Sequence, residues 1–181
     1  GVRSDSDMHT LGYSFRPWPT DKSIVEGSLI RDYIADTAYV TGVARAIRFG
    51  HRVIKAAWSS ADARWTVEVA IGPDKRRASF TCSFLFTCTG YYDYAQGYTP
   101  EWPGLERFKG KLMHPQFWDE GYGYSGKRIV IIGSGATAVT LAPAMATDAG
   151  HVTILQRSPS YVVARPAIDA IAQRLQARLP N

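Results

Sequence analysis

The 181-residue sequence lacks the features that define several large protein classes. Its longest unbroken apolar runs, such as 129–132, have four residues, whereas a membrane-spanning helix needs about 20. The first residues include no apolar stretch, so we expect no secretory signal. The net charge of +5 forms no dense basic stripe, which argues against a nucleic-acid partner. Apolar residues make up 45% of the chain, enough for a buried core and too many for a disordered protein.

Cysteine is also scarce, because only Cys82 and Cys88 are present. They lie in one run that predicts a strand, where the rise per residue separates them by about 20 Å, too far for a disulfide. We expect both to be reduced, small core residues, which favours the cytoplasm. The absence of a C-x-x-C pair argues against a disulfide-reductase-like flavoprotein, and no metal site is predicted.

Hydrophobic patterning predicts an α/β fold that includes an antiparallel β-meander. Residues 1–27 predict an irregular, aromatic loop, and a helix follows from Ser28, its expected N-cap, to about Thr41. Alternating apolar residues then predict strands at 52–58, 64–71 and 78–87. Residues 91–126 are rich in glycine, proline and aromatic residues and predict a functional linker. A last helix is expected after Pro166.

The strongest motif follows a wholly apolar strand at 129–132. Residues 133–138 have the pattern G-x-G-x-x-A and open a helix, which is the context of a dinucleotide-binding loop. Gly133 permits the tight turn, Gly135 lets a pyrophosphate approach the backbone, and Ala138 allows the helix to pack closely. The N–H groups at the helix start attract phosphates. A glycine turn without a ligand is the alternative.

A second predicted strand, at 151–156, ends in the sequence Gln156-Arg157-Ser158. An NAD site typically has an acidic residue at this point, whereas an arginine and a hydroxyl suit the 2′-phosphate of NADP. The sequence therefore favours NADP over NAD. An exposed cation at the end of a strand is the alternative interpretation of Arg157.

The linker contains Phe108-x-Gly110-x-x-x-His114-x-x-x-Trp118-Asp119. This pattern resembles the fingerprint of the Baeyer–Villiger flavin monooxygenases. Gly1-x-x-x-Asp5 matches the end of a second fingerprint of that family, whose beginning would lie before residue 1. The sequences of residues 3–8, 133–140 and 156–159 are most similar to those of the ethionamide-activating subgroup. The resemblance covers essentially the whole chain.

The resemblance implies an internal fragment of a flavoprotein with two Rossmann-like dinucleotide-binding domains. Residues 1–107 would form part of the FAD-binding domain, 108–126 the fingerprint linker, and 127–181 the N-terminal part of the NADP-binding domain. No G-x-G-x-x-G loop for FAD occurs in residues 1–128. We therefore expect that the chain alone is inactive and retains no FAD.

The resemblance also assigns site residues. Asp5 matches an acidic residue near the flavin and the nicotinamide, Arg3 and Ser4 match NADP contacts, and Val53 matches the residue whose backbone holds the flavin adenine. The residues expected to hold NADP in the second domain are Gly133, Ser134, Gly135, Ala136, Thr137, Ala138, Val139, Thr140, Arg157 and Ser158.

Two further residues are candidates for a role in the reaction. A peroxide anion buried away from water needs a nearby cation, and family members use an arginine that an aspartate holds. Arg165 is the candidate here, and an exposed residue before the last helix is the equal alternative. His114 is expected to belong to a hinge that couples the nucleotide domains, and not to act as a general base.

Members of this family reduce FAD with NADPH and capture O₂ as a C4a-peroxide. The peroxide converts a ketone into an ester or lactone, and some members oxidise sulfur. We expect the chain to be a fragment of such an enzyme, with FAD and NADPH as cofactors and a small ketone or sulfur compound and O₂ as substrates. Its partner would be the remainder of its own chain. A non-catalytic NADP-binding module and an N- or S-oxygenating flavin monooxygenase are the alternatives.

Overall fold

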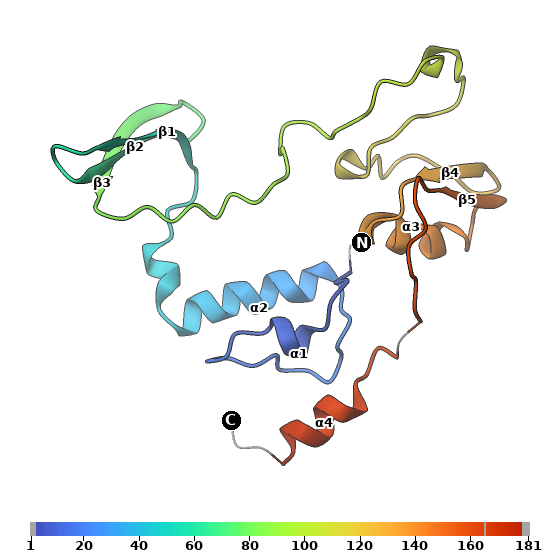
Figure 1. Cartoon of the computed structure of the whole chain (residues 1–181), viewed down its shortest axis with the longest axis horizontal. Helices are drawn as coiled ribbons and strands as arrows, with labels where there is room; N and C mark the ends of the chain where they lie inside the picture. Colours follow the sequence, from blue (N-terminus) through green and yellow to red (C-terminus); the bar gives the residue numbers. More distant parts are fainter. Residues whose placement is uncertain (1–2, 165, 179–181) are drawn as a thin grey trace. The chain divides into compact units, whose positions relative to one another are not determined.

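The computed structural model describes residues 3–164 and 166–178 of the chain. The chain divides into two compact units, one made of Gly1–Val40 with Gln96–Asn181 and the other of Thr41–Ala95. The first unit contains the α-helices and a parallel pair of strands, and the second contains an antiparallel sheet (Figure 1). This combination confirms the predicted α/β class with a β-meander.

The N-terminal segment contains two helices, α1 (Met8–Leu11) and α2 (Gly27–Val40). The helix predicted before Thr41 is therefore confirmed, but Ser28 is not its N-cap, because the helix already begins one residue earlier. The short helix α1 was not predicted. Its N-cap is Asp7, whose carboxylate accepts a hydrogen bond from the backbone N–H of His9 at 2.9 Å. One such local bond orders part of the expected loop.

A small aromatic core holds this segment together. Its buried members are Met8, Trp18, Val25 and Tyr33. The rings of Trp18 and Tyr33 meet edge to face, with centroids 5.1 Å apart, a favourable geometry for aromatic pairs. The Tyr33 hydroxyl accepts a hydrogen bond from the Tyr13 N–H at 2.9 Å and donates one to the carbonyl of Arg16. Tyr33 therefore ties the loop before α2 to the helix itself.

Three segments that are distant in the sequence meet at residues 23–25. The Ser4 N–H donates to the Val25 carbonyl at 2.8 Å, and the Val25 N–H donates to Ser4 Oγ at 3.0 Å. On its other side, the Ser23 N–H donates to the carbonyl of Ala167 at 2.8 Å. Val25 and Ser23 are 0% and 1% exposed, so their backbone groups depend on these partners. The segment that carries Asp5 is thereby fixed.

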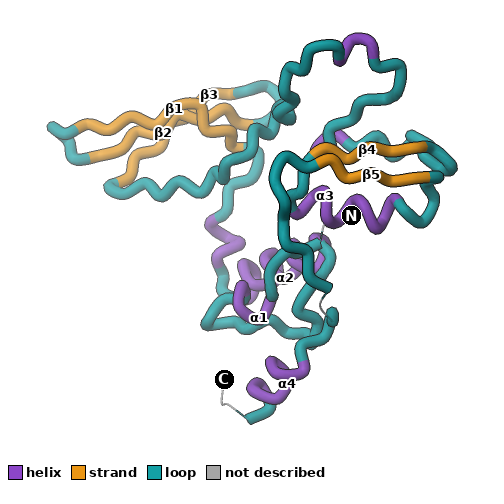
Figure 2. The backbone as a smooth tube through the Cα atoms, turned by 45° about the vertical axis from the view of Figure 1, so that its right-hand side comes forward, coloured by secondary structure: helices purple, strands orange, loops and turns teal. Residues whose placement is uncertain are grey.

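The second unit contains the predicted meander. Its strands β1 (His51–Ser59), β2 (Arg64–Ile71) and β3 (Arg76–Cys82) pair antiparallel in that order (Figure 2). The prediction that the third strand continues to residue 87 is wrong. Cys82 pairs with Trp65, and β2 begins only one residue before Trp65, so β2 cannot extend the ladder along residues 83–87.

Because β3 ends at Cys82, the two cysteines differ in how far they are buried. Cys82 is half-buried in the strand, but Cys88 lies beyond it and is exposed, so the prediction that both are core residues is wrong for Cys88. Both thiols are free, as predicted. Phe84 and Phe86, which lie in the part of the predicted strand that does not form, are 75% and 77% exposed.

The C-terminal third of the chain contains the predicted strand, loop, helix and strand. The strands β4 (Arg128–Ile132) and β5 (His151–Leu155) run parallel, and α3 (Ala136–Met145) packs against both (Figure 2). Ala138 and Met145 are the buried residues of α3. The last predicted helix is α4 (Ala170–Gln176), capped by the Asp169 carboxylate.

Substitution of Tyr33 by phenylalanine tests the aromatic core. The change leaves the partly buried N–H of Tyr13 and the carbonyl of Arg16 without their hydroxyl partner, so we expect the free energy of unfolding to fall by about 0.5–1.5 kcal/mol. Urea unfolding would measure the loss. Tyr39 lies on the same helix and is 77% exposed, so Tyr39→Phe is the matched control. Equal stability of the two variants would contradict this account of the core.

Candidate functional site

The candidate site lies where β4 and β5 end side by side. Ile132 pairs with Leu155 in the parallel register, and the next residue, Gly133, donates its N–H to the Leu155 carbonyl at 2.8 Å. The carboxyl ends of parallel strands lie at the same edge of a sheet, which is where α/β folds bind ligands. The glycine loop, residues 133–135, therefore meets the clamp segment, residues 157–160.

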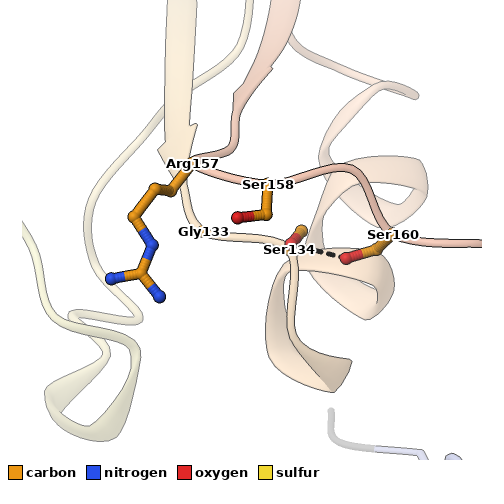
Figure 3. A pocket seen from close by; sticks show the side chains of 5 residues that line it. All are labelled: Gly133, Ser134, Arg157, Ser158 and Ser160. Carbon is orange, nitrogen blue, oxygen red and sulfur yellow. Dashed lines mark hydrogen bonds between the residues drawn. The ribbon is translucent and has the colours of Figure 1, made fainter.

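These two segments line an open cavity of ≈ 360 Å³. It is here called the cofactor cavity, because the sequence predicts a dinucleotide there. Its lining residues are Gly133, Ser134, Arg157, Ser158 and Ser160 (Figure 3). Figure 3 shows the Arg157 guanidinium on one side of the cavity and the hydroxyls of Ser134 and Ser160 facing each other on the other. Those two hydroxyl oxygens are 2.9 Å apart and share a hydrogen bond.

The chemistry of this lining suits a phosphate group. A guanidinium offers several N–H donors in a fixed plane, and serine hydroxyls can turn to donate to the same oxygens. The exposed fraction of Arg157 is high, so its charge can reach a ligand. Ser160 is a lining residue that the sequence interpretation missed. The signal that could have found it is the second hydroxyl in Ser158-Pro159-Ser160.

The two glycines of the loop are needed for different reasons. Gly133 has a φ of 120°, which side-chain-bearing residues rarely adopt. Gly135 has an ordinary φ of −75°, and a Cβ built there has no atom of the described chain within 4 Å. The missing side chain of Gly135 thus leaves room for a ligand beside the backbone, as the dinucleotide motif requires.

The helix that follows adds further donors. Gly135 is the N-cap of α3, and within the described chain no side chain caps the helix there, so N–H groups of its first turn are available to an anion. Ala138 packs inward, while the Thr140 hydroxyl donates to the Ala136 carbonyl at 2.9 Å. The remaining loop residues predicted to bind NADP, Ala136, Thr137 and Val139, lie on the exposed part of the first turns.

The N-terminal candidates lie outside the cofactor cavity lining. Arg3 pairs with Glu26 in a β-bridge, and Ser4 is held by Val25. Asp5 is exposed, and its carboxylate accepts a hydrogen bond from the Ser6 hydroxyl at 3.3 Å. Arg165 lies outside the described residues.

Val53, the predicted adenine contact, occupies an irregular part of the meander. It lies on β1, an edge strand, and the register with β2 shifts between Val53 and Lys55. A bulge of this kind redirects backbone groups and is often found beside active sites. A cavity of ≈ 920 Å³ opens at Val53. Its lining includes the basic residues Arg52, Lys75 and Arg77, which the sequence interpretation did not connect with Val53.

Residues 111–121, which include the second half of the fingerprint, form a loop that is here called the linker loop. The Lys111 ammonium and the Asp119 carboxylate are 3.4 Å apart, and Asp119 also accepts a hydrogen bond from the Gly121 N–H at 3.2 Å. Within the loop, His114 Nδ1 accepts a hydrogen bond from the Gln116 N–H at 3.2 Å. This bond caps the 3-10 helix η3 (Pro115–Phe117).

In residues 3–164 and 166–178, no three His, Cys, Asp or Glu side chains are grouped to hold a metal ion. Over the same ranges, no helix is both long and apolar enough to cross a membrane.

Comparisons with known proteins agree on one family. A model described as flavin-binding monooxygenase-like matches residues 4–172. MymA of Mycobacterium tuberculosis is 52% identical over 185 aligned residues, and the FAD-containing monooxygenase EthA of that species is 51% identical over 182. Both cover 100% of this chain, which spans 37% of their length. An oxidised steroid monooxygenase bound to NADP is 28% identical with a TM-score of 0.71; the match covers 98% of this chain and 34% of that one.

Alanine substitutions at the two glycines separate their roles. Gly133→Ala places a side chain at a strained φ, so we expect the free energy of unfolding to fall by roughly 1–3 kcal/mol. Gly135→Ala should cost less than about 1 kcal/mol of stability, but should weaken the binding of NADP⁺, the nucleotide predicted from the sequence, because its methyl group enters the ligand space. Urea unfolding and calorimetric titration would measure the two effects. Equal stability losses with unchanged binding would contradict this division.

Proposed function

Because the chain belongs to the flavin-binding monooxygenase-like family, we propose that it is part of an FAD- and NADPH-dependent monooxygenase. The fingerprint predicts a flavin monooxygenase of the Baeyer–Villiger type, and membership of the flavin-binding monooxygenase-like family is confirmed. The chain spans 37% of the length of MymA and EthA, so we assign the activity to a longer protein. Within it, residues 1–107 would belong to the FAD-binding domain, 108–126 to the linker and 127–181 to the NADP-binding domain.

The cofactor cavity supports NADPH as the reductant. Arg157 would bind the 2′-phosphate, which NADH lacks, and the hydroxyls of Ser158 and Ser134 would complete its hydrogen bonds. The pyrophosphate would lie over Gly135, where the backbone is open and the N-terminus of α3 offers N–H groups. The lining residues are therefore of the kinds that bind the phosphates of a dinucleotide.

The meander supports a contribution to FAD binding. Val53 lies on an edge strand beside a bulge, so part of its backbone can pair with the adenine and not with β2. A bound flavin would supply the activation of O₂: one oxygen atom would enter the substrate, and the other would leave as water with two electrons from NADPH and two protons. The rest of the FAD site would come from residues outside this chain.

Asp5 and Arg165 are proposed to act at the reacting centre. Asp5 would orient the arginine whose charge stabilises the developing oxyanion. One backbone and one side-chain hydrogen bond between Ser4 and Val25 hold the segment that carries Asp5, and such fixed positions are what catalytic charges need. His114 would keep the linker loop in the shape that couples NADPH oxidation to oxygen transfer.

The observation that carries the proposed reaction is the fingerprint from Phe108 to Asp119, whose second half lies in the linker loop that Lys111 and Asp119 join. We propose that the enzyme inserts oxygen beside the carbonyl of a ketone and so forms an ester or lactone. The same transfer would oxidise a sulfur compound. The two free cysteines suit the cytoplasm, where disulfides are rare.

The full-length protein would test this function directly. We expect it to purify with FAD, to oxidise NADPH faster when a ketone is present, and to place one atom of ¹⁸O₂ in an ester or lactone detected by mass spectrometry. A sulfoxide would move the assignment to sulfur oxidation. NADPH binding without flavin or oxygenation would instead identify a non-catalytic nucleotide-binding module and refute the proposal.

Replacement of Arg157 by alanine tests the choice of nucleotide. The variant loses a charge-assisted contact with the 2′-phosphate, so we expect its affinity for NADPH to fall about 10- to 100-fold, while its affinity for NADH changes little. Competitive titration with both nucleotides would measure the ratio. Equal losses for the two nucleotides would count against a 2′-phosphate contact.

A further inference from the structure

Gly97 and His114 approach each other closely in the first unit. A Cβ added at Gly97 would lie at most 2.5 Å from three atoms of the His114 ring: Nδ1, Cε1 and Cγ. Non-bonded carbon atoms normally stay about 3.5 Å apart. Any residue other than glycine at position 97 would therefore displace the ring.

The backbone of Gly97 does not itself require glycine. Its φ is not among the positive values of the described glycines, so an ordinary residue could adopt the same conformation. The requirement comes from the ring alone, which distinguishes Gly97 from Gly133 and the other turn glycines.

A hydrogen bond also holds the His114 ring in place. His114 Nδ1 accepts from the Gln116 N–H at 3.2 Å and caps η3. An accepting Nδ1 places the proton of a neutral imidazole on Nε2. A ring displaced from Gly97 could not keep this bond in its present geometry, so the start of η3 would shift with it.

We propose that Gly97 is a positioning residue for His114, and that the fingerprint therefore has an additional required position 17 residues before its histidine. Gly97 provides the flat surface against which the ring lies, and the ring in turn sets the shape of the linker loop. Its effect on catalysis rests on the proposed function, through the coupling of NADPH oxidation to oxygen transfer. The Gly97–His114 contact itself does not depend on that function.

Four variants of the full-length protein test the proposal: Gly97→Ala, His114→Ala, the double variant, and Gly123→Ala. Gly123 is the matched control, because its φ is not positive and a Cβ there meets no described atom within 4 Å. We expect Gly97→Ala to reduce the yield of oxygenated product per NADPH about tenfold with FAD content unchanged. The double variant should equal His114→Ala, because the methyl group then occupies the space of the missing ring.

Thermal unfolding of the same set gives a result that is independent of activity. Gly97→Ala should lower the melting temperature in the wild-type background and have no effect in the His114→Ala background. If Gly97→Ala alone fails to fold and the double variant folds, the contact is confirmed. If neither folds, if the two effects add, or if Gly97→Ala matches Gly123→Ala, the proposal is overturned. A wild-type protein that makes no oxygenated product would refute the proposed function and leave the unfolding test in force.

Discussion

The candidate site depends on the parallel pairing of β4 with β5. Because both strands run in the same direction, the glycine loop after β4 and the clamp segment after β5 leave the sheet at one edge. The bond from Gly133 to Leu155 extends the ladder one residue beyond β4 and so fixes the distance between the segments. The loop supplies open backbone and the clamp supplies charge. We propose that dinucleotide binding requires both segments.

The parts of this site that the sequence predicts are those whose conformation is local. The apolar run before Gly133 predicts a strand, and the glycine pattern after it defines the turn and the start of α3. The place of Arg157 beside the glycine loop is predictable too, because it follows β5, the strand that comes next after the glycine motif and pairs with β4. The meander is also largely predictable, since the turn residues and alternating apolar positions of β1 and β2 are adjacent in the chain.

The parts that the sequence does not predict depend on which segments meet in space. The end of β3 is set by where β2 begins and not by the sequence of residues 83–87, which continues to alternate. Ser160 enters the site only because its hydroxyl reaches Ser134, 26 residues away. The need for glycine at position 97 is invisible in its own neighbourhood, because the ring that excludes a side chain belongs to His114.

The bonds between Ser23 and Ala167 join residues 144 positions apart. Closing so long a loop costs chain entropy before any contact repays it, and the cost grows with the logarithm of the loop length. Long-range contacts of this kind slow folding relative to local ones. The aromatic core around Tyr33 and the β4–β5 pair can form from near neighbours. The segment after the clamp segment would then pack onto residues 23–25 late, when the aromatic core and the β4–β5 pair have already formed.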